Sequence, residues 1–152
     1  MAFKKLLIAT DFSEIATRAL LRGIEIARFA DASVVLLHVV ENTWYPGTFG
    51  VGPMPLPDFE TQIKGAARDR LEALRKEFVP QGMSCRTLLS DGVPWSEIVR
   101  AARDEKVDLI VVATHGFTGL KHALLGSQAE RVVRHAPCPV LTVPADKAAP
   151  AS

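Results

Sequence analysis

The fold of this chain is decided by the stretch Asp108-Leu109-Ile110-Val111-Val112-Ala113-Thr114-His115-Gly116 and, after nine intervening residues, Gly126-Ser127. Its apolar part is short, continuous and rich in β-branched residues, which is typical of a strand buried on both faces of a parallel sheet. A glycine just after such a strand lets the backbone turn with positive φ and lets a ligand approach closely. The pattern therefore predicts a strand, a tight turn and a helix start in succession.

The expected helix start is also an expected anion site. Ser127 with Glu130 three residues on makes a capping box, which predicts a helix over Ser127–Arg134. Unpaired N–H groups and the positive end of the macrodipole stabilise phosphate at a helix N-terminus. Taken alone, Gly116 is explained as a turn residue and Ser127 as a cap. Their combination after a strand favours a phosphate site.

This spacing resembles that of the ATP-binding members of the universal stress protein family, which carry Gly, two residues, Gly, nine residues, then Gly and Ser or Thr. The matching positions here are Ala113, Gly116, Gly126 and Ser127, so alanine replaces the first glycine. The resemblance implies that the protein binds ATP. The carboxylate of Asp11 offers a magnesium ligand beside the phosphates.

Two further segments extend the resemblance over about Phe3 to Val143. Leu6–Ser13, LLIATDFS, is similar to the first strand and turn of the family, and Pro137–Leu141 is similar to its last strand. The resemblance implies one doubly wound, five-stranded parallel sheet in the order 3-2-1-4-5, with helices on both faces, of the adenine nucleotide alpha hydrolase-like type. Ligands bind such a sheet where the strand order reverses, between the first and fourth strands.

Periodicity along the chain independently predicts a parallel α/β sheet, because strand-like runs alternate with helical patterns. Strands are expected at Lys4–Ala9, Ser33–Val39, Ser84–Leu89, Asp108–Ala113 and Val140–Val143. A first helix is expected after Ser13 as N-cap, with Ala16, Leu20, Ile24 and Ala27 on its apolar face. A second repeats Phe59, Ile63, Ala66, Leu71, Leu74 and Phe78; a third begins at Pro94 and buries Trp95, Ile98, Val99 and Ala102.

The family resemblance assigns a role to each expected site residue. Asp11 contacts the adenosine side; a turn aspartate bonded to the backbone of Ser13 is the less favoured alternative. The backbone of Val39 reads adenine. The floor is formed by Val112 and Ala113, and the phosphates are held by Gly116, Gly126, Ser127 and Gln128 through backbone N–H groups and the serine hydroxyl. With Ala9 at the end of the first strand, the expected nucleotide-binding set is Ala9, Asp11, Val39, Val112, Ala113, Gly116, Gly126, Ser127 and Gln128.

Binding rather than catalysis is the expected function. His115 lies inside the motif, but no nucleophile or orienting carboxylate pairs with it in the sequence, so we interpret it as a turn residue. His38 is interpreted as a hydrogen-bonded core residue. A P-loop is absent from the sequence. Two alternatives stay open: a dimeric interaction module that binds no nucleotide, which Ala113 favours, and a slow ATPase in which Asp11 holds magnesium.

Composition narrows the remaining function classes. With 152 residues, 48% of them hydrophobic, the chain is expected to form one domain over 1–144 and a disordered tail over 145–152. Eighteen basic and 17 acidic residues give a net charge of +1 without basic runs, which argues against nucleic-acid binding. Cys85 and Cys138 lack metal-like spacing and are expected to be reduced, buried thiols. With neither a leader nor an apolar span in the sequence, we expect a cytoplasmic protein without membrane contact.

Two segments concern partners. Val140–Val143 would be an exposed edge of the sheet in a monomer, and family members commonly dimerise there, so we expect a homodimer through this strand. Asn42–Asp58, with four prolines and three glycines, is expected to be irregular, as a specificity lid or as a surface excursion. A further protein partner is expected, but the sequence does not identify it.

Overall fold

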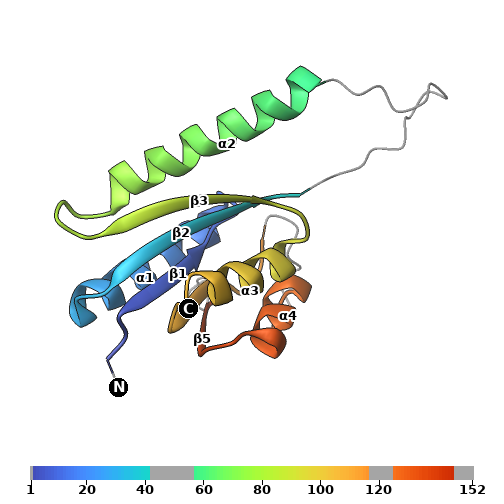
Figure 1. Cartoon of the computed structure of the whole chain (residues 1–152). Helices are drawn as coiled ribbons and strands as arrows, with labels where there is room; N and C mark the ends of the chain where they lie inside the picture. The colour runs from blue at the N-terminus through green and yellow to red at the C-terminus, as the bar shows by residue number, and fades with distance from the viewer. Residues whose placement is uncertain (1, 42–56, 117–124, 146–152) are drawn as a thin grey trace, which may run out of the picture.

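The sheet has the predicted architecture. The computed structural model describes residues 2–41, 57–116 and 125–145. All neighbouring strands are parallel and their order is β3-β2-β1-β4-β5, as Figure 1 shows. Along the described chain the elements are β1 (Lys5–Ala9), α1 (Glu14–Ala30), β2 (Ser33–Val40), α2 (Pro57–Phe78), β3 (Cys85–Asp91), α3 (Pro94–Asp104), β4 (Leu109–Ala113), α4 (Ser127–His135) and β5 (Val140–Val143).

Helices cover both faces of the sheet, because alternate strand residues point to opposite sides. Helices α1 and α2 lie on one face, and α3 and α4 lie on the other (Figure 1). The first core cluster includes Leu6, Ile8, Leu20, Leu71 and Val111. The second includes Leu7, Ile98, Ile110, Val112 and Val132. The central strands β1 and β4 are therefore buried on both sides, as their continuous apolar sequences predict.

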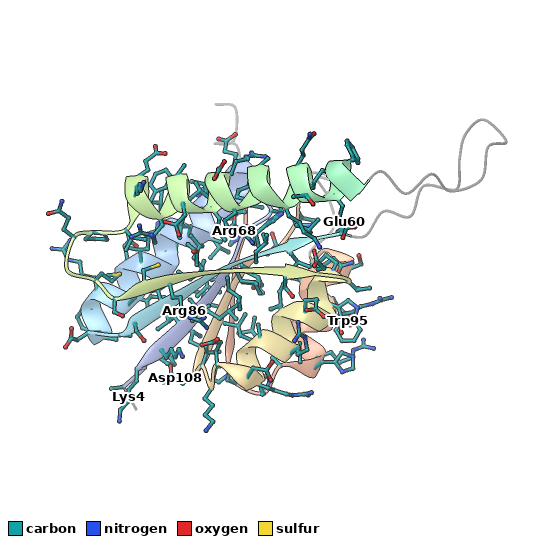
Figure 2. The ribbon with its side chains drawn as sticks, turned by 45° about the horizontal axis from the view of Figure 1, so that its top comes forward. Lys4, Glu60, Arg68, Arg86, Trp95 and Asp108 are labelled. Carbon is teal, nitrogen blue, oxygen red and sulfur yellow. The ribbon has the colours of Figure 1, made fainter. Side chains whose placement is uncertain are left out.

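The two central strands are joined at their amino ends by Asp108. Its carboxylate accepts hydrogen bonds from the backbone N–H of Lys4, at 2.8 Å, and of Lys5, at 3.3 Å. Figure 2 shows Lys4 and Asp108 together at this end of the molecule. The strand order reverses between β1 and β4, so the ligand crevice expected of this fold lies at the opposite, carboxyl edge.

The predicted starts of two helices are confirmed. The Ser13 hydroxyl oxygen accepts a bond from the backbone N–H of Ala16 at 3.2 Å, so Ser13 is the N-cap of α1. Pro94 is the first residue of α3, where its missing N–H costs no intrahelical bond. Trp95, predicted to be buried, is half-buried because its ring lies over α4, 4.9 Å from the ring of His135.

Helix α2 differs from the prediction at its start. It begins at Pro57, so the irregular segment expected over Asn42–Asp58 is too long by two residues, and its remainder, 42–56, lies outside the described residues. Phe59 and Ile63, expected in the core, are 59% and 41% exposed. Ala66, also expected there, is exposed, while Ala67 and Leu71 are buried. The buried residues of the helix thus begin in its third turn, whereas Ile63, in the second, lines the pocket described below.

The helices of the described segments include none with the length and apolarity needed to span a bilayer. Of the tail expected over 145–152, all but Ala145 lies outside the described residues.

Candidate functional site

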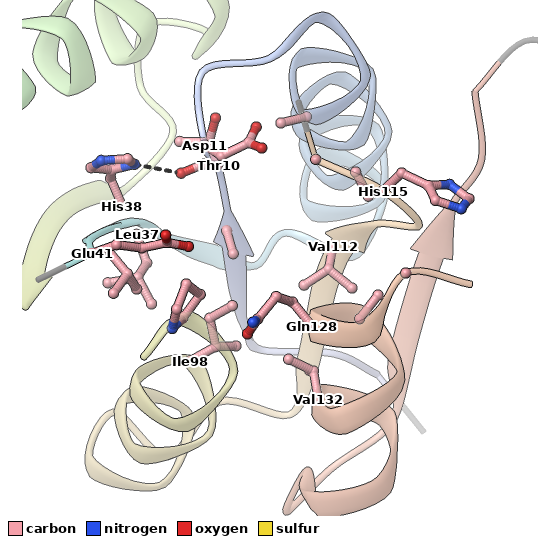
Figure 3. A pocket seen from close by; sticks show the side chains of 18 of the residues that line it. Thr10, Asp11, Leu37, His38, Glu41, Ile98, Val112, His115, Gln128 and Val132 are labelled. Carbon is pink, nitrogen blue, oxygen red and sulfur yellow. Dashed lines mark hydrogen bonds between the residues drawn. The ribbon is translucent and has the colours of Figure 1, made fainter. Parts of the chain in front are cut away.

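A pocket of about 670 Å³ opens at the carboxyl edge of the sheet, as Figure 3 shows. Its volume falls within the range of about 300–1,000 Å³ that is usual for small-molecule sites. The ends of β1, β2 and β4 meet there with the first turns of α3 and α4, directly at the reversal of strand order. The fold thus creates its main crevice at the position where doubly wound sheets bind ligands.

All nine residues expected from the sequence line this one pocket. They come from four separate parts of the chain: Ala9 and Asp11; Val39; Val112, Ala113 and Gly116; and Gly126, Ser127 and Gln128. Their contact with a nucleotide stays a prediction. The lining also includes residues that the sequence did not single out for the site, among them Thr10, His38, Glu41, Ile98, Thr114 and His115.

Asp11 is the turn aspartate that the sequence offered as an alternative, and it also lines the pocket. Its Oδ1 accepts hydrogen bonds from the backbone N–H of Ser13, at 2.9 Å, and from the Ser13 hydroxyl. A Cβ built on Gly116 would lie 2.5 Å from the other oxygen, Oδ2. Asp11 is therefore a turn aspartate through one oxygen, while the second oxygen faces the Gly116 loop at the pocket.

The turn after β1 is fixed by an unusual backbone conformation. Phe12 has φ +67°, in the left-handed region that residues with a Cβ rarely adopt, and its N–H donates to Thr10 Oγ1 at 3.0 Å. Its ring packs between the His38 ring, with centroids 4.2 Å apart, and the Arg70 guanidinium, 4.3 Å from the ring centroid. Contacts from β2 and α2 thus hold the turn that carries Asp11.

His38 donates a hydrogen bond at the edge of the pocket. Its Nδ1 lies 2.8 Å from the carbonyl oxygen of Thr10, which can only accept, so Nδ1 carries a proton. Burial lowers the pKa of His38, against opposing effects of the Thr10 bond and the carboxylates of Asp11 and Glu41. The prediction of a hydrogen-bonded histidine is confirmed, but the ring is half-buried beside the pocket rather than enclosed in the core.

The start of α4 corrects the expected capping box. Gly126, not Ser127, is the N-cap, with φ −67° and no side-chain cap, and Glu130 pairs with Arg134 instead of reaching back. The reason is a backbone bond of 2.7 Å from Gly126 N–H to the carbonyl of Thr114, which places Gly126 outside the helix. A Cβ on Gly126 would lie 2.8 Å from that same oxygen. Glycine is therefore required at position 126 because the backbone passes close to the Thr114 carbonyl, and not because the loop needs a positive φ there.

The first turn of α4 supplies the donors of the pocket. The first intrahelical bond runs from Glu130 N–H to the Gly126 carbonyl at 2.9 Å, so the amides of Ser127, Gln128 and Ala129 precede the helical hydrogen-bond ladder. All three residues line the pocket. No lysine or arginine occurs among the described lining residues. An anion at this end of the pocket would be held by backbone N–H groups and the helix macrodipole.

Ala113, which replaces the first glycine of the family pattern, directs its methyl group away from the α3–α4 side. Val112 packs in the cluster beneath α3 and α4, whereas Ala113 packs against the cluster beneath α1. Adjacent strand residues point to opposite faces. The additional methyl group thus adds an apolar contact on the α1 face.

Gln128 links the two helices that border the pocket. Its Oε1 accepts a hydrogen bond of 3.0 Å from the backbone N–H of Trp95 at the start of α3. The two residues are 33 positions apart, and no local pattern signals the contact, so sequence reasoning missed it. Figure 3 shows the Gln128 side chain reaching across the floor toward Ile98.

His115 and the two cysteines lie in different surroundings. His115 Nδ1 lies 3.0 Å from Thr114 Oγ1, but its buried Nε2 has no partner to orient the ring. In Figure 3 this ring points away from the pocket. Cys85 and Cys138 are free, half-buried thiols. The described residues contain no cluster of three or more His, Cys, Asp or Glu side chains suited to a metal ion.

Comparison with known proteins establishes the family. The sequence profile of the universal stress protein family matches residues 2–144. This chain belongs to that family. Universal stress protein MJ0531 of Methanocaldococcus jannaschii is 38% identical over 141 residues, covering 93% of this chain and 82% of that protein. Universal stress protein MJ0577 of the same organism is 34% identical over 154 residues, covering 93% and 94%.

Solved structures of universal stress proteins share the fold. The structure of MJ0577 matches with a TM-score of 0.81 at 33% identity and covers 97% of this chain and 100% of its own. A universal stress protein from Archaeoglobus fulgidus, solved in complex with dAMP, matches with a TM-score of 0.58 at 23% identity, covering 94% and 99%. The second likeness shows the common fold alone.

Proposed function

We propose that this universal stress protein binds an adenine nucleotide, ATP, in the pocket at the carboxyl edge. One observation carries the proposal: the amides at the start of α4, which precede its hydrogen-bond ladder, belong to residues that line the same pocket as the ends of β1, β2 and β4. Gly126 lets this helix start approach the Thr114 carbonyl closely, which sets its position at the pocket. Phosphate would lie on these amides, where it needs no basic side chain.

The rest of the pocket suits the nucleoside. Val39, Ile98 and Val112 give it apolar walls, against which a purine ring would bury its faces. The Val39 backbone would read the base edge. Asp11 Oδ2 would accept from a ribose hydroxyl or, with phosphate oxygens, hold a magnesium ion. These oxygen donors fit magnesium, which prefers carboxylate and phosphate ligands.

The output we propose is regulation through binding. A ligand shifts a conformational equilibrium by its differential affinity for two states, and the segment from Gly116 to Gly126 joins two parts of the pocket. Most of that segment, 117–124, lies outside the described residues. The nucleotide would thereby change the surface offered to a protein partner.

Calorimetric titration of ATP with magnesium into nucleotide-stripped protein tests the proposal. We expect saturable micromolar binding. If no heat of binding is detected and added ATP leaves the melting temperature unchanged, the pocket is not a nucleotide site, and a dimeric module without nucleotide becomes the better account. A phosphate-release assay, with Asp11→Ala as control, separates binding from slow hydrolysis.

We further propose that the protein forms a homodimer through β5. This strand lies at one edge of the sheet and pairs with β4 on one side. An open edge presents unpaired N–H and C=O groups that a second strand can bond. Light scattering at micromolar concentration is expected to give twice the chain mass; a monomer mass would overturn this proposal without affecting the nucleotide site.

A further inference from the structure

Gln128, a residue of α4, caps the N-terminus of a different helix, α3. The N-cap of α3 is Val93, whose side chain cannot accept a hydrogen bond, and Pro94 has no N–H. The backbone N–H of Trp95 is therefore the first donor of α3, and Gln128 Oε1 accepts it at 3.0 Å. The carboxamide of Gln128 thus crosses from α4 to α3 along the floor of the pocket.

This contact fixes the orientation of the amide. A backbone N–H can only donate, so the carbonyl oxygen of Gln128 must face Trp95 and the NH₂ group must face the other way. The side chain extends toward Ile98, and Val112 and Val132 line the floor beside it (Figure 3). These neighbours are apolar and cannot accept. Within the described residues no acceptor is bonded to Gln128 Nε2, and the exposed side chain lines the pocket.

We propose that Gln128 is a specificity-determining residue whose Nε2 donates a hydrogen bond to the nucleoside half of the ligand. This inference rests on the proposed nucleotide site and adds a second function to Gln128. Its backbone N–H lies at the helix start with the phosphate donors, whereas its amide lies toward Ile98 on the apolar side. The ligand atom that meets the amide must be an acceptor, such as a purine ring nitrogen or a ribose oxygen. A ligand offering a donor there would leave two donors facing each other.

Two substitutions separate the donor from the helix cap. Gln128→Glu keeps the length of the side chain and an oxygen that accepts from Trp95 N–H, but replaces the NH₂ group by a second acceptor. Gln128→Met has a similar volume and removes both functions. Arg134→Gln is the matched control for the charge change, because Arg134 lies on the exposed face of α4 and does not line the pocket. Adenosine is used beside ATP because it has no phosphates that the new carboxylate could repel.

We expect Gln128→Glu and Gln128→Met each to weaken adenosine binding about tenfold, as loss of one hydrogen bond in a binding site does. Arg134→Gln is expected to bind adenosine as the wild type does. Circular dichroism and thermal melts verify that each variant is folded, and a variant that unfolds is replaced by Gln128→Leu.

Unchanged adenosine affinity in Gln128→Glu, while the wild type binds both ligands, would overturn the inference and leave the proposed function intact. If ATP binding to Gln128→Glu is nevertheless weakened, the effect is phosphate repulsion. If Gln128→Met alone binds adenosine more weakly, the role of Gln128 is the α3 cap. Failure of the wild type to bind either ligand would instead remove the proposed function itself, and the inference with it.

Discussion

Gly116 lies so close to Asp11 that a Cβ on the glycine would stand 2.5 Å from the Oδ2 of the carboxylate. This contact joins the turn after β1 to the loop after β4, on either side of the reversal in strand order. The carboxylate cannot simply rotate, because its Oδ1 is held by the N–H and hydroxyl of Ser13. The position of Asp11 in the pocket therefore depends on the absence of a side chain at Gly116.

Gly116→Ala is expected to displace Asp11 and weaken ATP binding about tenfold, with a stability loss of about 1 kcal/mol from the disturbed bonds to Ser13. Titration calorimetry and urea unfolding measure the two effects. Gly65→Ala is the matched control, because a Cβ there meets nothing within 4 Å. Wild-type ATP affinity in Gly116→Ala would show that Asp11 is not required in its observed position.

Adding Asp11→Ala to Gly116→Ala tests the origin of the stability loss. If the new methyl group strains the fold only through the carboxylate, the double variant should be no less stable than Asp11→Ala alone. Additive losses in the urea midpoint would instead indicate that the alanine disturbs the loop by another route.

Gly126→Ala probes the phosphate end of the pocket. The new Cβ would lie 2.8 Å from the Thr114 carbonyl, a backbone atom that cannot swing aside, so the first turn of α4 must shift. Because the expected phosphate donors are the amides of that turn, ATP affinity should fall more than tenfold while adenosine affinity changes less. Paired titrations of the two ligands check this, and an equal loss for both would place the phosphates elsewhere.

Most of the fold is predictable from the sequence because it rests on local patterns. The apolar run of β4, the cap at Ser13 and the proline at the start of α3 each reflect the conformational preference of a few neighbouring residues. The observed strand bounds agree with the expected ones within two residues. The strand order came from the family resemblance. All nine expected site residues then line one pocket, since the carboxyl ends of parallel strands meet at one edge.

The parts that the sequence did not reveal depend on contacts between distant segments. The N-cap of α4 is set by the bond from Gly126 to Thr114, which overrides the local capping-box pattern at Ser127. The link between Gln128 and Trp95 requires α3 and α4 to lie side by side at the pocket. Helix α2 illustrates the same limit, because a helical period at Phe59 and Ile63 does not reveal which turns of the helix other elements cover.

The thiol of Cys85 is expected to react slowly in the folded protein. Burial raises its pKa to about 11, so at pH 8 roughly one thiol in a thousand is ionised. In a Cys138→Ala background, a disulfide reagent should therefore label Cys85 about a hundredfold more slowly in the native than in the denatured protein. Comparable rates in the two states would mean that the thiol samples solvent freely.

His38 is expected to make stability depend on pH. Burial lowers its folded-state pKa below the ordinary value of 6.5, so near and below that value the unfolded chain binds more protons than the folded one. The free energy of unfolding should therefore fall as the pH drops through 6.5 and level off below the folded-state pKa. The carboxylates of Asp11 and Glu41 and the guanidinium of Arg70 act on the ring, so these residues are left unchanged.

The variant His38→Asn isolates this effect, because its amide can still donate to the Thr10 carbonyl but does not titrate in this range. Urea unfolding between about pH 5 and pH 7.5 should give a flatter profile for the variant than for the wild type. Hydrogen bonds to Thr87 and Arg75 hold the pKa of Glu72 below its ordinary 4.5. Hydrogen bonds to Arg100 and Ser90 do the same for Glu97. The stability that these two carboxylates contribute is therefore lost only at lower pH. Parallel profiles for the two proteins would show that another group carries the pH dependence.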